Sequence, residues 1–145
     1  MKRFKFNLEK VLELRQYGEQ EAKNELGRAI GILTGIENKI KQNAVTRGQA
    51  ARQRFEGINA PGGASSMTAW DSYILRLEQE TERLMEEAAQ AELVVEEKRS
   101  LYLEASRELK VMEKLKEKRE AEYRKEMFAA ETKELDDLKK LEAAN

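Results

Sequence analysis

Apolar residues recur at alternating steps of four and three over two long stretches of the chain. In the first stretch these positions are Leu8, Leu12, Ala22, Leu26, Ala29, Leu33, Ile36 and Ile40, with Arg15 and Glu19 interrupting. In the second they are Trp70, Ile74, Leu77, Leu84, Ala88, Ala91, Val95, Tyr102, Ala105, Leu109 and Met112, with Thr81 and Lys98 interrupting. Sustained spacing of this kind is typical of coiled-coil helices. The many alanines among these positions favour a close approach of two helices.

The segment "EGINAPGGASSMTAW" separates the two stretches. Its Gly57, Pro61, Gly62 and Gly63 should break a helix, and Ser65, Ser66 or Thr68 is expected to cap the next one. We therefore predict one domain over residues 1–145. It comprises a helix over about 4–57, a turn over about 58–66 and a helix over about 67–142. The fold class is all-α, a long antiparallel two-helix coiled-coil hairpin. A kinked continuous helix that dimerises is the alternative.

The two predicted helices differ in length, so the second should overhang the first. With the turn near residue 62, residue i of the first helix should face residue 123 minus i, plus one or two. The amino terminus then lies near Arg119, and residues 120–145 have no partner within the hairpin. An apolar stripe continues along this overhang: Tyr123, Met127, Phe128, Leu135, Leu138 and Leu141. An uncovered apolar stripe predicts a surface that binds a partner.

Gly27, Gly31 and Gly35 form a ladder inside the first predicted helix. Their spacing is that of close-packing seams in membrane helices. The heptad phase instead places all three away from the hairpin seam. Two interpretations stay open: a soft spot that costs about 3 kcal/mol of helix propensity in total, or a smooth face against which a partner lies.

Composition narrows the possible functions. Charged residues make up 38% of the 145 residues, the net charge is −1, and cysteine and histidine are absent. We expect no catalytic residues, no metal site and no cofactor, because histidine and cysteine are missing for zinc binding and histidine-based acid–base catalysis, and paired carboxylates such as Glu86–Glu87 are expected on a solvated helix face. The Gly-rich "NAPGGASS" lacks the lysine of a phosphate-binding loop. No stretch is apolar enough to insert into a membrane, and the charge balance argues against nucleic acid. We expect a cytoplasmic protein that is not an enzyme.

Two terminal segments carry a resemblance to a known family. The amino-terminal "FKFNLEKVLELRQYGEQEAKNELGRA" and the later "LYLEASRELKVMEKLKEKREAEYRKEMFAAETKELDDL" resemble the flagellar export protein FliJ family, in the right order and at the right length. The resemblance implies a stalk-like hairpin that binds and stimulates the hexameric flagellar export ATPase. It also implies contacts with the export gate, a membrane protein, and with export chaperones. Its implied location is peripheral, at the cytoplasmic face of the inner membrane at the flagellar basal body.

The resemblance also implies two sets of site residues. The ATPase-binding set is Phe4, Phe6, Leu8, Arg119, Tyr123, Met127, Phe128, Leu135 and Leu138. The set expected to contact the gate and chaperones is Ile40, Val45, Phe55, Trp70, Tyr73 and Leu77. The first helix is less aromatic than the family pattern, since "NAVTRGQAA" supplies only Val45.

Basic residues at the termini have two interpretations. The amino-terminal ones are Lys2, Arg3, Lys5 and Lys10, and the others are Lys114, Lys116, Lys118, Arg119, Arg124 and Lys125. They either steer association with the ATPase or form an ordinary solvated face with neighbouring glutamates. Two alternative functions also stay open, the equivalent stalk protein of a virulence injectisome and a generic coiled-coil scaffold or dimerisation module. The pattern F-x-F-x-L-x-x-V-L-x-x-R, from Phe4 to Arg15, favours the flagellar system.

Overall fold

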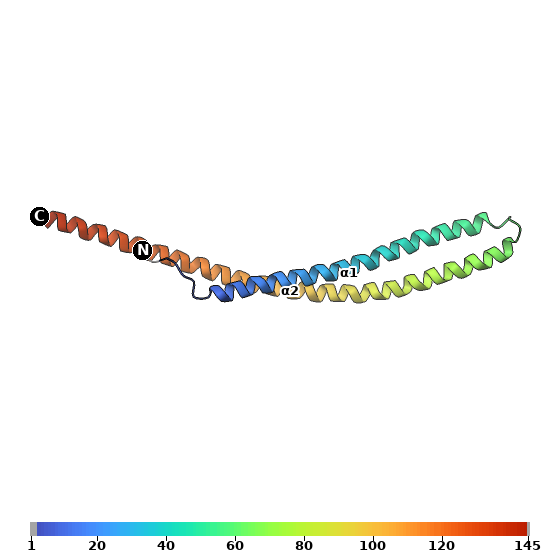
Figure 1. The fold of residues 1–145 in the computed structure, drawn as a ribbon, viewed down its shortest axis with the longest axis horizontal. Coiled ribbons are helices and arrows are strands. Elements are labelled where there is room, and N and C mark those ends of the chain that lie inside the picture. The colour runs from blue at the N-terminus through green and yellow to red at the C-terminus, as the bar shows by residue number, and fades with distance from the viewer. Residues whose placement is uncertain (1–2, 145) are drawn as a thin grey trace. The chain divides into compact units, whose positions relative to one another are not determined.

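A computed structural model describes residues 3–144 and confirms an all-α helical hairpin. Helix α1 runs over Glu9–Glu56 and helix α2 over Gly63–Ala144, with no strand among the described residues (Figure 1). The chain divides into two compact units. One combines Met1–Ala22 with Tyr102–Asn145, and the other is Lys23–Leu101. Each is described below by itself as the terminal unit and the turn unit, respectively.

The turn between the helices depends on two adjacent glycines. Gly62 has a φ of +78°, a conformation that side chains with a Cβ rarely adopt. A Cβ on Gly63 would lie 2.6 Å from the carbonyl oxygen of Ile58, so only glycine fits there. Ser66 N–H donates to the Gly62 carbonyl oxygen at 3.1 Å, and α2 begins at Gly63 rather than near residue 67. The prediction that Ser65, Ser66 or Thr68 caps α2 is therefore wrong, because all three lie inside its first turns.

The predicted seam is present in the turn unit. Ala29, Leu77, Leu84 and Val95 are buried, and the other predicted positions of this unit are half-buried. Three ion pairs join the helices across it: Arg47–Glu78 at 2.7 Å, Arg54–Asp71 at 2.6 Å and Lys98–Glu25 at 3.9 Å. The two residue numbers of each pair add up to 123 or 125, within one residue of the predicted sums of 124 or 125.

Beyond Ile40 the α1 side of the seam is polar or small. Its half-buried Asn43 faces Thr81 in the ion-pair register, and Ala50 is buried. Thr81 Oγ1 donates to the Leu77 carbonyl oxygen at 2.8 Å, whereas Asn43 Nδ2 is buried without a hydrogen-bond partner. In this region, large side chains of α2 face small α1 residues such as the buried Ala50, and arginine ion pairs join the two helices. No leucine of α1 packs against a leucine of α2 here.

In the terminal unit, α1 begins five residues later than predicted. Residues 3–6 are not helical, and the Glu9 N–H donates to the Phe6 carbonyl oxygen at 3.1 Å in the turn that leads into α1. The physical reason is the burial of Phe6 against Leu12 and Leu109, which folds the segment back onto the helices. Ion pairs Arg15–Glu108 at 2.8 Å and Lys116–Glu9 at 3.0 Å join α1 to α2 in this unit.

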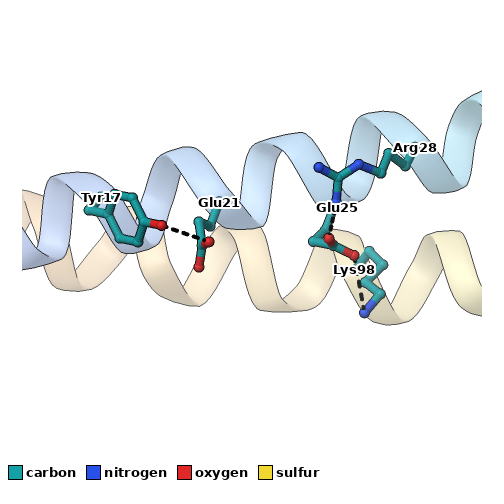
Figure 2. A network of polar contacts seen from close by, with 5 residues as sticks. All are labelled: Tyr17, Glu21, Glu25, Arg28 and Lys98. Carbon is teal, nitrogen blue, oxygen red and sulfur yellow. Dashed lines mark hydrogen bonds and ion pairs between the residues drawn. The ribbon is translucent and has the colours of Figure 1, made fainter.

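Exposed side chains of α1 make polar contacts with one another and with Lys98 of α2 (Figure 2). In the terminal unit, Tyr17 Oη donates to Glu21 Oε1 at 3.0 Å, and this bond raises the pKa of the exposed Tyr17 phenol. In the turn unit, Glu25 contacts both Arg28 and Lys98. A Cβ on any ladder glycine would meet no atom within 4 Å, so the ladder faces open space, as the heptad phase predicts.

Candidate partner-binding surfaces

The amino-terminal aromatic residues pack within the terminal unit. Phe6 is only 8% exposed, and Phe4 and Leu8 pack against the core that it forms with Leu12 and Leu109. Apolar side chains buried in this way hold the segment in place and leave little surface for a partner. Phe4, Phe6 and Leu8 of the predicted ATPase-binding set therefore support the predicted binding surface from below and are not its exposed part.

Two α2 residues of the same set cover this base. The Phe4 and Tyr123 rings are 5.6 Å apart, and the Arg119 guanidinium lies 5.9 Å from the centre of the Phe6 ring. The structure thus brings the amino-terminal members of the predicted set, Phe4 and Phe6, together with its α2 members Tyr123 and Arg119 through aromatic and cation–π contacts. A hollow of about 460 Å³ lies beside them, lined by Phe4, Lys5, Phe6, Glu9, Lys116 and Glu120.

The end of α2 has no α1 segment against it. Residues 128–144 are exposed throughout, including Phe128 at 72%, Leu135 at 59% and Leu138 at 57%. Met127 is half-buried. The predicted overhang is therefore helical (Figure 1, orange to red), and the stripe residues Phe128, Leu135, Leu138 and Leu141 are exposed. The prediction that residues 120–145 lack a partner is wrong at the start of this segment, because the Phe4 ring packs against Tyr123.

Two of the basic residues near the termini are already paired. Lys116 contacts Glu9, and Arg124 lies 3.9 Å from Glu120 one turn away. These exposed pairs are worth a few tenths of a kcal/mol to about 1 kcal/mol each. Lys2 lies outside the described residues. The solvated-face interpretation accounts for Lys116 and Arg124, and Arg119 is engaged by Phe6.

The second predicted set does not form one patch. Leu77 and Ile40 belong to the seam, whereas Val45 and Phe55 are 62% and 76% exposed. Trp70 and Tyr73 come together, with ring centres 6.0 Å apart in an edge-to-face arrangement.

These two aromatic residues border a hollow of about 640 Å³ that we call the tip groove. Its lining is Thr46, Gln49, Ala50, Arg52, Gln53, Trp70 and Tyr73. A smaller hollow of about 390 Å³ shares Thr46 and continues along α1, lined by Lys41, Gln42, Val45 and Thr46. None of the α1 residues that line the tip groove belongs to the predicted set. One feature of the sequence could have indicated this side of the groove. The regular spacing of apolar residues ends at Ile40, and beyond it the first helix carries mainly amide and small side chains along the seam.

The described part of the molecule contains no buried charged side chain and no group of histidine, cysteine or carboxylate residues arranged to hold a metal ion. None of its helices is long and apolar enough to cross a membrane. The features that stand out are surfaces.

A comparison with protein families identifies the chain. The sequence model of the family described as "Flagellar FliJ protein" matches residues 4–145, which include the amino-terminal segment, both helices and the turn between them. The chain belongs to the flagellar FliJ protein family. Comparisons with curated proteins and with solved structures gave no significant match.

Membership of the FliJ family assigns the protein to flagellar export. The match extends through the uncovered end of α2, so this end is part of the family pattern and not an appendage to it. It also decides between the alternatives left open by the sequence, in favour of the flagellar system over the injectisome and over an unrelated scaffold.

Proposed function

We propose that this FliJ-family protein is a non-enzymatic, stalk-like component of the flagellar type III export apparatus. It binds and stimulates the hexameric export ATPase through its terminal unit. It contacts the export gate and the export chaperones through its turn unit. It acts at the cytoplasmic face of the inner membrane, at the flagellar basal body, and flagellum assembly and motility depend on it.

The observation that carries the ATPase part is the apolar stripe on the uncovered end of α2. Phe128, Leu135 and Leu138 are helical and exposed, and no part of α1 covers them. Exposed aromatic and aliphatic residues that share a helix are the usual anchors of a protein interface. The packed residues Phe4, Phe6 and Leu8 support the start of this surface, and nearby cations such as Arg119 steer association.

An ATPase assay tests this part with a chain that ends at Tyr123. The truncation keeps Phe4, Phe6 and their α2 contacts, so helicity and the thermal midpoint of the hairpin should persist while stimulation of the ATPase is lost. Full stimulation by the truncated chain would refute the assignment of the overhang.

A matched pair of point variants separates the stripe from helix content. Leu135→Ser with Leu138→Ser should abolish stimulation. Lys133→Ser with Asp137→Ser, on the opposite side of the same turns and with no change in net charge, should leave stimulation within about twofold of the unmodified chain. Equal effects of the two double variants would contradict a specific stripe.

The gate and chaperone part is supported by the aromatic pair at the tip groove. Trp70 and Tyr73 keep part of their surface exposed beside a hollow, which is the arrangement of an interface anchor rather than of a closed seam. Co-purification of the chain with the cytoplasmic part of the gate, and with export chaperones, tests it. Deletion of the gene should abolish motility.

A further inference from the structure

Residues 3–8 precede α1 and lie along α2 in the terminal unit (Figure 1, dark blue), and we call them the strap. The Phe4 ring is 5.6 Å from the Tyr123 ring, and the Arg119 guanidinium is 5.9 Å from the centre of the Phe6 ring. A step of two residues along the strap thus matches a step of four residues along α2. An extended chain advances about 3.3 Å per residue and a helix about 1.5 Å, so the two steps are of nearly equal length. This part of the strap is therefore extended and antiparallel to α2.

The strap covers one section of a continuous face of α2. Positions at steps of three and four define this face: Leu109, Met112, Lys116, Arg119, Tyr123 and Met127. Helix α1 covers the face as far as Lys116, which contacts Glu9 in the first turn of α1 at 3.0 Å. The strap covers it at Arg119 and Tyr123, and residues 128–144 are exposed. The strap therefore lies between the hairpin seam and the exposed end of α2.

Few interactions hold the strap in place. Within residues 3–8, only the Phe6 side chain is buried. The Glu9 N–H donates to the Phe6 carbonyl oxygen at 3.1 Å, and the Leu12 N–H donates to the Leu8 carbonyl oxygen at 2.9 Å, both at the junction with α1. No backbone hydrogen bond among the described residues joins the strap to α2. A chain end held by a few side chains opens more easily than the two long helices beside it.

The position of the strap concerns the proposed ATPase-binding stripe directly. Tyr123 is the first residue of that stripe and is also the contact of Phe4. Tyr123 is half-buried, whereas Phe128, further along the stripe, is 72% exposed. With the strap open, the stripe would continue from Tyr123 back toward Leu109. A partner gains this additional area only in the open state, so its binding shifts the strap toward opening.

We propose that the strap is a movable cover, closed in the free protein, that opens when the export ATPase binds the stripe. The inference rests on the proposed function for the identity of the partner, and it adds regulation of the same surface. The closed strap supports the start of the stripe but covers part of it, which restrains ATPase stimulation. In the open state, Arg119 and Tyr123 join the interface, and the rings of Phe4 and Phe6 are released for contact with the partner.

A reversible cross-link in the full chain tests this proposal. Lys5 and Glu120 line the hollow beside the strap and belong to neither predicted binding set. The chain has no cysteine, so Lys5→Cys combined with Glu120→Cys provides one reactive pair and leaves the net charge unchanged. A bismaleimide with a disulfide in its linker locks the strap closed, and a reducing agent then releases it. We expect half-maximal ATPase stimulation to require about tenfold more of the locked chain than of the released chain.

The control applies the same linker to Arg15→Cys combined with Glu108→Cys. This pair replaces an ion pair between α1 and α2, so the cross-link fixes the two helices and leaves the strap free. It should change the half-maximal concentration by less than about twofold, because it does not distinguish the open strap from the closed one. Circular dichroism establishes that both cross-linked chains are as helical as the unmodified chain.

A second measurement follows the strap itself. Pyrene maleimide on the Lys5→Cys, Glu120→Cys chain forms an excimer while the two labels are close together. Addition of the ATPase should reduce the excimer emission of this chain and leave that of the Arg15→Cys, Glu108→Cys chain unchanged.

Each other outcome overturns a defined claim. Equal stimulation by the locked and released chains, or excimer emission that persists in the complex, overturns the strap proposal while the ATPase part of the proposed function stands. Stronger stimulation by the locked chain also overturns it, because the strap would then be a support and not a cover. An equal loss in the control chain overturns the assignment to the strap. Absence of stimulation by the unmodified chain overturns the proposed function and this inference with it.

Discussion

Two phenylalanines of the terminal unit have opposite environments. Phe6 is 8% exposed in a contact with Leu12 and Leu109, and Phe128 is 72% exposed on the end of α2. The same substitution should therefore have different effects at the two positions.

We predict that Phe6→Ala lowers the free energy of unfolding by about 3 kcal/mol, because it removes a buried ring and leaves a cavity. Phe128→Ala should change that free energy by less than about 0.5 kcal/mol while weakening ATPase stimulation. Chemical denaturation followed by circular dichroism measures the first effect. Equal destabilisation by both substitutions would contradict the described burial.

Asn43 is a polar residue in the seam with a buried Nδ2 that has no hydrogen-bond partner. Leaving such a donor unsatisfied costs free energy that an apolar side chain would not. We predict that Asn43→Leu stabilises the protein by about 1–2 kcal/mol. Asn38→Leu, at an exposed position of the same helix, should stay within about 0.5 kcal/mol, as thermal and chemical unfolding would show.

The seam positions within the two helices could be predicted because each element has one period. A residue such as Leu84 or Val95 is buried because it recurs in phase with its neighbours, and the register followed from the position of the turn alone. The element ends could not be obtained this way. Phe6 precedes α1 and packs back against Leu12 and Leu109, a tertiary contact that periodicity does not encode. Ser65 and Ser66 are good caps, yet Gly62 and Gly63 let α2 begin before them.

The tip groove shows a second limit of periodicity. A run of glutamines and alanines on α1 predicts solvent exposure, and only the facing Trp70 and Tyr73 make it a concave surface. Of the residues predicted to contact the gate and chaperones, Trp70 and Tyr73 therefore border the groove, and the α1 residues beside them were not predicted.

Helix α1 carries the glycine ladder at a cost to its own stability. Each ladder glycine has open space where a Cβ would lie, so alanine fits without strain. We predict that replacing Gly27, Gly31 and Gly35 together with alanine raises the free energy of unfolding by about 2–3 kcal/mol.

A contrasting variant and an export assay complete this test. Gly63→Ala should destabilise the protein, because its Cβ would lie 2.6 Å from the Ile58 carbonyl oxygen. Reduced export by the triple variant despite higher stability would identify the ladder as a partner-facing strip, whereas unchanged export would leave it a soft spot.

At the scale of the whole molecule, the seam residues of α1 pair with α2 of the same chain and not with a second chain. Five ion pairs link α1 to α2: Arg15–Glu108, Lys116–Glu9, Lys98–Glu25, Arg47–Glu78 and Arg54–Asp71. We predict that the isolated protein is a monomer at micromolar concentration in sedimentation equilibrium. A tight dimer would favour the alternative in which two kinked helices pair between chains.

The uncovered end of α2 also has a consequence for the lifetime of the protein in the cell. A helix end without tertiary partners opens easily, and open backbone is what a protease cleaves. We expect limited proteolysis with trypsin to cut first beyond Arg124, at sites such as Lys133, Lys139 and Lys140, before it cuts the part of α2 that packs against α1. The bound export ATPase should slow this trimming, so the abundance of intact protein would follow the abundance of its partner.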